Sequence, residues 1–230
     1  VLILADDTPA AQLRAASLAV AVHAPMLIYR SERHADVIRE IERMSTHTVY
    51  AVGNVPVLGY TDKLTVIKDP GGHVALEKAT ALRFTEQEVA AEQDAAAAVA
   101  GLADGEPTWL RAGYGPQQHV ADDAEPGVVP VRSRQDAEMA PQVIALPESS
   151  LAAIATARAF GANVYLADKP DPRESHLTLV LTAGLSELPL VALGKAFGTS
   201  GELAQRIREA EENTQPGDLN NISSLPQSPH

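Results

Sequence analysis

The sequence predicts an α/β protein of two Rossmann-like units, each with a parallel sheet flanked by helices. Three observations carry this prediction: short apolar runs suited to buried strands, helical patterns between these runs, and a second set of the same elements later in the chain. Strands of a parallel sheet are buried on both faces, so they appear as short, continuous apolar runs. A chain of 230 residues, 45% of them hydrophobic, is long enough to bury such a core.

The first unit is predicted to follow the order strand, helix, strand, helix, strand. Its strands are expected at residues 1–4, 26–29 and 49–52, and its helices at 9–23 and 34–44. Asp6, Asp7 and Thr8 offer side-chain oxygens that cap a helix, and Pro9 fits the first turn. The third strand is closed by Gly53 and Asn54.

The same order returns after residue 140. Strands are expected at 143–146, 164–167 and 188–193, and helices at 151–160, 175–183 and 199–212. Thr199 and Glu202 have the spacing of a capping box at the start of the last helix. An ungapped match supports an internal duplication: Leu13, Ala15, Ala19, Ala21 and Ala24 correspond to Leu151, Ala153, Ala157, Ala159 and Ala162.

The region between the copies is predicted to differ from both. It has a strand at 64–68, a turn at 70–72, a long helix at 85–102 opened by a Thr85/Glu88 capping box, a strand at 108–112 and short strands around 128–131. The predicted organisation is therefore a first unit with an added strand and helix, a loop-rich connection, a second unit and a flexible tail: residues 1–112, 113–140, 141–212 and 213–230.

Composition excludes several classes of protein. A formal net charge of -12 argues against nucleic-acid partners, because phosphate binding depends on Lys and Arg. The absence of cysteine excludes disulfides and thiolate metal sites. No apolar run approaches the roughly 18 residues that span a bilayer. The sequence begins at Val1 without Met, which is compatible with a signal peptide or lipid anchor upstream.

The candidate binding residues lie at strand ends, where open α/β sheets place their ligands. Asp6 and Asp7 follow the first strand and have the chemistry to hold Mg²⁺ or to act as acid and base. A simpler interpretation makes one of them a helix cap and leaves the other solvated. Gly53 and Asn54 close the third strand, while Gly194 and Lys195 suit either an anion site or a plain turn.

No cofactor, metal site or catalytic set is predicted. The seven histidines are scattered, and neither a phosphate-binding glycine motif nor a nucleophile elbow is present.

Three stretches of the first unit resemble the cell-wall-binding type 2 repeat of Gram-positive surface proteins. They are Leu-Arg-Ala-Ala-Ser-Leu-Ala at 13–19, Ala-Pro-Met-Leu-Ile at 24–28 and Val-Tyr-Ala-Val-Gly-Asn at 49–54, with a looser copy at 143–194. Two copies are recognisable, whereas members of the family usually carry three in tandem. The resemblance implies an extracytoplasmic location, in the cell envelope, and binding of an anionic wall polymer where the repeats meet.

Three functions are compatible with the sequence. The leading one is a non-catalytic envelope protein, secreted or lipid-anchored, that binds cell-wall polymer or another envelope component. An alternative is an accessory scaffold subunit docked on the outer face of a membrane protein complex, with the connection and the tail ordered against the partner. The second alternative is a small-molecule binder or enzyme that uses the strand ends near Asp6 and Asp7.

Overall fold

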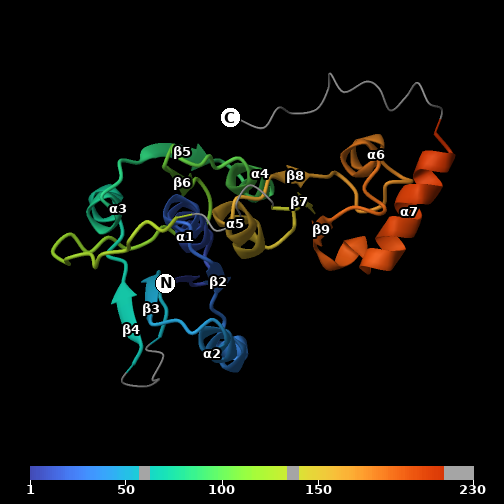
Figure 1. The fold of residues 1–230 in the computed structure, drawn as a ribbon. Coiled ribbons are helices and arrows are strands. Elements are labelled where there is room, and N and C mark those ends of the chain that lie inside the picture. Colours follow the sequence, from blue (N-terminus) through green and yellow to red (C-terminus); the bar gives the residue numbers. More distant parts are fainter. Residues whose placement is uncertain (57–62, 134–139, 215–230) are drawn as a thin grey trace.

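The computed structural model describes residues 1–56, 63–133 and 140–214. It confirms the predicted fold class: all strands pair in parallel, in three sheets that helices flank (Figure 1). Of the flexible tail predicted at 213–230, residues 215–230 lie outside the described residues, as does the 134–139 part of the predicted connection.

The first sheet contains the three strands predicted for the first unit and the strand predicted at 64–68. Its elements are β1 (Leu2–Ala5), α1 (Pro9–Val22), β2 (Met26–Ile28), α2 (His34–Arg43), β3 (Thr48–Val52) and β4 (Thr65–Lys68). The strand order is β2-β1-β3-β4. Thr8 caps α1 by accepting from the Ala11 amide, and Pro9 occupies the first turn as predicted.

The unit after residue 140 has the same topology. Its elements are β7 (Gln142–Ala145), α5 (Leu151–Ala159), β8 (Val164–Leu166), α6 (His176–Thr182), β9 (Leu190–Leu193), a short 3-10 turn (Lys195–Phe197) and α7 (Ser200–Glu212). The order β8-β7-β9 repeats β2-β1-β3. The predicted Thr199/Glu202 capping box at the start of α7 is confirmed.

The ungapped sequence match corresponds to equivalent backbone geometry. At the end of α1 the Ala24 amide donates to the Ala19 carbonyl, and at the end of α5 the Ala162 amide donates to the Ala157 carbonyl, both over 3.0 Å. The turn residue before each of these donors is left-handed: His23 has φ 57 and Gly161 has φ 92. Matching alanines therefore mark matching helix ends.

The long helix predicted over 85–102 is wrong. Residues Thr85–Val89 form strand β5, which is followed by a 3-10 turn (Glu92–Asp94) and only a short helix, α4 (Ala95–Ala100). The predicted strand β6 (Thr108–Ala112) pairs with β5 in parallel and forms a second, two-stranded sheet. This pairing prevails over the helical propensity of Glu86, Gln87 and Glu88, which stay exposed on the strand.

The region 85–112 is therefore a third β-α-β unit. In each unit the residue after the second strand donates to the last carbonyl of the first strand: Tyr29 to Ala5, Gly113 to Val89 and Ala167 to Ala145, over 2.7, 2.8 and 2.8 Å. A further helix that the sequence pattern did not indicate, α3 (His73–Thr80), connects β4 to β5.

The three units pack in a closed ring around their helices. In Figure 1, α1, α4 and α5 lie together in the middle of the molecule, where they share one apolar core with the inner faces of the sheets. Each helix packs on the second strand of another unit: α1 on β6, α4 on β8 and α5 on β2. The Ser17 hydroxyl of α1 accepts from the Leu110 amide of β6, over 2.9 Å. Helix α2 covers the outer face of the first sheet, and α6 and α7 that of the third.

The described part of the connection is ordered against the first unit. Its backbone amides at Ala121, Val129 and Arg132 donate to the carbonyls of Pro70, Ala79 and Val22. The short strands expected around 128–131 are absent, because Val129 bonds to the end of α3 instead of to a strand and buries its side chain. The loop-rich character predicted for this connection is confirmed in residues 113–133.

His73 forms a clamp between α3 and the second sheet, that is, its ring bonds a carboxylate on each, and we expect this contact to depend on pH. Its ring bonds Glu86 of β5 over 2.9 Å and Glu77 of α3 over 3.2 Å. The bond to Glu86 raises the pKa of His73 above its ordinary value of 6.5. A raised pKa in the folded state means that the clamp stabilises the protein fully below pH about 6.5 and is lost as pH rises through the raised value.

We therefore expect wild type to have a higher free energy of unfolding than His73→Gln at pH 6, and we expect this difference to shrink towards pH 8. Urea denaturation at both pH values measures this difference, and an NMR titration of the His73 ring measures the pKa directly. A pKa of 6.5 or lower would contradict the clamp.

Candidate functional site

A cavity of about 710 Å³ lies where the three units meet. Its walls are the segments that follow the first strand of each unit: Asp7, Pro9 and Gln12 from the first, Glu92, Gln93 and Ala95 from the second, and Pro147, Glu148, Ser149, Ser150 and Leu151 from the third. Ile28, Arg30 and Tyr114, which follow or end second strands, complete the lining. The volume lies in the range of about 300–1,000 Å³ that is usual for ligand pockets.

Parallel topology explains why these residues converge. The carboxyl ends of the strands and the first turns of the following helices lie at the same edge of each sheet. The packing of α1, α4 and α5 brings these edges together. Ser150 caps α5 by accepting from the Ala153 amide, and Ser149 donates to the Leu193 carbonyl of β9 over 2.5 Å. The third unit's wall is thus fixed by its own hydrogen bonds.

Each unit contributes one carboxylate to the cavity: Asp7, Glu92 and Glu148. Arg30 is the only cation among the described lining residues, and its Nε and Nη2 bond Asp7 over 3.0 and 2.9 Å. Gln12 also donates to Asp7, over 3.1 Å. The described lining therefore carries three negative carboxylates and one positive guanidinium, so negative charge is in excess.

Tyr114 adds an aromatic wall with a polar tip. Partial burial, with the nearby carboxylates of Glu92 and Asp94, raises the pKa of its phenol above the ordinary value of 10. The hydroxyl stays protonated at neutral pH and remains able to donate as well as accept. An apolar ring beside amides and carboxylates suits a ligand with both hydroxyl groups and apolar faces.

Of the sequence-predicted residues, only Asp7 lines this cavity. Asp6 is used by its own loop: it accepts from the Thr8 amide over 2.8 Å, the Thr8 hydroxyl over 2.5 Å and the Asn54 amide over 2.6 Å. Gly53 stands against Asp6 with φ +81, and a Cβ there would lie 2.2 Å from the carboxylate oxygen. Asp6 therefore ties its own loop to the turn at Gly53 and Asn54. Asp7 instead bonds Arg30, so the two neighbouring carboxylates have different partners.

Replacing Asp6 with alanine is expected to lower the free energy of unfolding by about 1–3 kcal/mol, because the partly buried amide and hydroxyl of Thr8 and the exposed Asn54 amide lose their acceptor. Asp7→Ala is the matched control, since its exposed pair with Arg30 contributes about 0–1 kcal/mol. Thermal and urea denaturation of both variants measure the difference. Equal stability of the two variants would show that Asp6 does not hold the turn.

Gly194 and Lys195 lie on the third sheet, at the end of β9, outside the cavity lining. Lys195 is exposed and opens a 3-10 turn of only three residues (Lys195–Phe197), so the long helix N-terminus that an anion site needs does not begin there. Gly194 lies beside Ser149 and Phe197 in a turn.

Sequence patterns did not indicate that the second unit contributes residues to the cavity. Glu92 and Gln93 fell inside the helix predicted over 85–102, and Tyr114 fell in the predicted connection. A usable signal was present: Asp94 and the following alanines, with Gly101 behind them, repeat the polar start and small-residue body of the other two helices.

The described ranges contain no group of three or more His, Asp or Glu side chains arranged to hold a metal ion. Across the same ranges no helix combines the length and apolar character that a bilayer span needs.

The fold and the cavity define a protein of Rossmann-like α/β units whose candidate binding site lies at their meeting point. No protein-family model matches the sequence, and comparisons with curated proteins and with solved structures give no match either. The resemblance to the cell-wall-binding repeat therefore stays a prediction.

Proposed function

We propose that this protein is a non-catalytic, extracytoplasmic envelope protein that binds a hydroxyl-rich segment of a cell-wall polymer in the cavity between its three units. The observation that carries the proposal is the convergence of polar side chains from all three units on one cavity of about 710 Å³. The extracytoplasmic location is what the sequence resemblance implies, and a peripheral or lipid-anchored association with the membrane is part of the same proposal. The three-unit ring supports that resemblance, because the family usually carries three repeats.

The chemistry of the lining favours a neutral glycan segment. Sugar hydroxyls donate to carboxylates such as Glu92 and Glu148 and accept from amides such as Gln93. An anionic polymer would meet three carboxylates and one arginine that is already paired. The net charge of -12 acts in the same direction.

The arrangement favours binding over turnover. The adjacent carboxylates that an acid–base mechanism would use, Asp6 and Asp7, do not face a common point: one braces the turn at Asn54 and the other pairs with Arg30.

Retention on purified cell wall tests the proposal. We expect wild-type protein to be retained at low salt and to stay bound as salt rises, because hydrogen bonds in a cavity are screened less than surface ion pairs. Gln93→Trp, which fills the cavity, is expected to reduce retention at least about tenfold, a loss of roughly 1.4 kcal/mol.

Gln87→Trp is the matched control, since Gln87 is an exposed glutamine on β5 outside the lining. It should bind like wild type. No retention of wild type at low salt, or equal retention of the two variants, would refute the proposed function.

A docking surface around α3 favours a second candidate, the accessory scaffold subunit. Four exposed valines lie on α3 or on the segment bonded to it; Val74 is 64% exposed, Val120 43%, Val128 73% and Val131 46%. A contiguous patch of exposed apolar side chains is typical of an interaction site, and this candidate requires the four valines to act as one. Co-purification with a detergent-solubilised membrane complex, lost on Val74→Lys with Val128→Lys, would support this candidate over wall binding.

A further inference from the structure

One edge of the third sheet matches an edge of the first sheet that carries an extra strand. In the first sheet β4 pairs with β3, whereas no described strand pairs with the matching edge of β9. Val52 and Leu193 each pair with the last residue of the strand beside them, β1 or β7. Ala192 of β9 therefore corresponds to Ala51 of β3, whose carbonyl faces β4 and accepts from the amide that follows β4.

The backbone groups at this edge of β9 belong to Leu190 and Ala192. Alternate residues of a strand point their N–H and C=O groups to the same side, and the match with Ala51 makes this the open side. Unpaired N–H and C=O groups at an edge are a template for another strand, and natural sheets often protect them with charges or proline. Strand β9 is Leu-Val-Ala-Leu and carries neither, and by the same alternation the backbone of Pro189, just before it, faces β7.

A groove of about 150 Å³ runs along the same edge, between β9 and α7. Leu190 and Ala192 line one side of it, and Leu203, Ala204 and Ile207 of α7 line the other. In the first unit, the corresponding apolar cluster under α2 takes in a side chain from β4. The groove therefore has the position and the apolar character to receive side chains from an added strand.

Two apolar side chains beside the groove are exposed, Leu188 by 58% and Val191 by 41%. Leu188 lines the groove itself, whereas Val191 lies on the other face of the strand from Leu190 and Ala192. This edge thus carries both projecting apolar side chains and an apolar groove. Such a surface is self-complementary, which is what an interface between two identical copies requires.

We propose that two copies of this chain associate through β9, edge to edge and antiparallel, so that their three-stranded third sheets form one continuous sheet. A two-fold axis makes two copies of one strand antiparallel. The register that uses both open residues pairs Leu190 of each copy with Ala192 of the other and places the axis at Val191. The two Val191 side chains then meet as a pair without hydrogen bonds, the closer kind of cross-strand pair.

Charge supports the same register. Glu187 and Lys195 lie four residues on either side of Val191, so each Glu187 comes opposite Lys195 of the second copy. Arg208 bonds Oε1 of Glu187, but this carboxylate is 81% exposed and stays accessible to a second cation. Each copy has a net charge of -12, so opposite charges at one edge favour this surface over the acidic remainder. None of these residues lines the cavity, which the dimer leaves open.

Sedimentation equilibrium of the full chain tests the interface. We expect wild type to form a dimer, and Val191→Lys to raise its dissociation constant at least about tenfold, because two like charges then face each other at the axis. Val74→Lys is the matched control. Val74 is a more exposed valine on α3, at the opposite end of the molecule from α7 (Figure 1), and its replacement should leave the dimer unchanged.

Charge reversal tests the register. Glu187→Lys places like charges opposite each other twice, once on each side of the axis, and is expected to weaken the dimer about fivefold. Combining Glu187→Lys with Lys195→Glu restores opposite charges and should return most of the lost affinity. No recovery in the double variant would overturn this register.

A single introduced cysteine gives a covalent test, because the sequence contains no other. With Val191→Cys, oxidised glutathione should link two copies through one disulfide and be reduced to two thiols, since side chains at the axis lie close together. Val74→Cys under the same conditions should leave the copies unlinked.

Three results would overturn the inference. The first is a wild-type protein that stays monomeric at every concentration, and the second is a dimer that Val191→Lys does not weaken. The third is a monomer whose Leu190 and Ala192 amides are protected from hydrogen exchange, since another segment of the same chain would then cover the edge. None of these results bears on retention by cell wall, so the proposed function is tested separately.

Discussion

Replacing Arg14 with methionine is expected to lower the free energy of unfolding by about 3–5 kcal/mol, the usual effect of breaking a buried ion pair. Arg14 and Asp69 are 1% and 0% exposed and bond through Nε–Oδ2 over 2.5 Å and Nη2–Oδ1 over 3.0 Å. Tyr50 and Gln118 donate to the same carboxylate. Methionine fills the volume but leaves Asp69 buried without its counter-ion. This pair also joins α1, the end of β4 and the connection.

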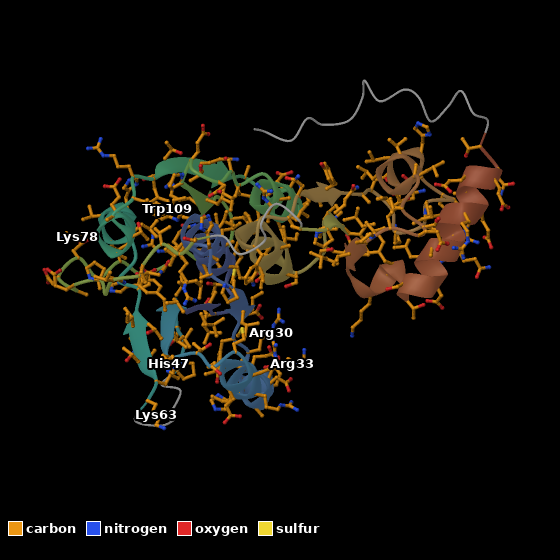
Figure 2. The ribbon with its side chains drawn as sticks, viewed as in Figure 1. Arg30, Arg33, His47, Lys63, Lys78 and Trp109 are labelled. Atoms are coloured by element: carbon orange, nitrogen blue, oxygen red, sulfur yellow. The ribbon has the colours of Figure 1, made fainter. Side chains whose placement is uncertain are left out.

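Urea denaturation measures this loss. The single tryptophan, Trp109 (Figure 2), reports it locally, because the Arg14 guanidinium lies 4.9 Å from the centroid of the Trp109 ring according to the contact geometry. Arg111→Met is the control: this half-exposed arginine pairs with Glu86 at the surface and should contribute no more than about 1 kcal/mol. A loss of less than about 1 kcal/mol from Arg14→Met would contradict the assigned role. Adding Asp69→Asn to the variant should recover part of the stability, since the unpaired charge is removed.

Replacing Arg158 with alanine is expected to have the second largest effect. We expect it to lower the free energy of unfolding by about 2–3 kcal/mol, because several hydrogen bonds from a charged donor disappear together. Arg158 lies in the last turn of α5, whereas the start of this helix lines the cavity. Its Nε and Nη2 bond the Leu102 carbonyl beyond α4, and Nη1 bonds the Ala162 carbonyl beyond α5. A cation here also interacts favourably with the carboxyl ends of both helices. The second and third units are thereby joined.

Hydrogen exchange distinguishes this role from general destabilisation. In Arg158→Ala, the amides of α4 and α5 should lose protection before those of α2, which packs on the outer face of the first sheet. Arg208→Ala is the control, since Arg208 is an exposed arginine whose pair with Glu187 lies at the surface. Uniform loss of protection across the chain would show that Arg158 does not specifically hold the two units together.

Sequence reasoning predicted the parts of the fold that are buried. The runs around Ile3, Tyr50 and Ile144 are fully enclosed, and burial on both faces of a sheet leaves a distinct apolar pattern. Strand β5 of the second unit leaves no such pattern, because it buries only Val89 and pairs on one side. Its helical composition then dominated the prediction. The helix α3 is short, and nothing caps its first turn through a side chain.

The candidate site was harder to predict, because it belongs to no single unit. Asp7 could be placed at a strand end from sequence, and it does line the cavity. Glu92 and Tyr114 come from the second unit and meet Asp7 only through the packing of three helices, which local patterns do not encode. Asp6 could not be told from Asp7 in sequence, since the difference lies in a contact with Asn54, 48 residues away.

Chemical-shift mapping is the most direct test of the central claim, that one ligand is bound where three units meet. Isotope-labelled protein is titrated with soluble fragments of purified cell wall while amide signals are followed. We predict that the largest perturbations fall on Asp7, Gln93 and Ser150, one residue from each unit, and that they saturate together. Perturbations confined to a single unit, or centred on β9 and α7 away from the cavity, would contradict the account.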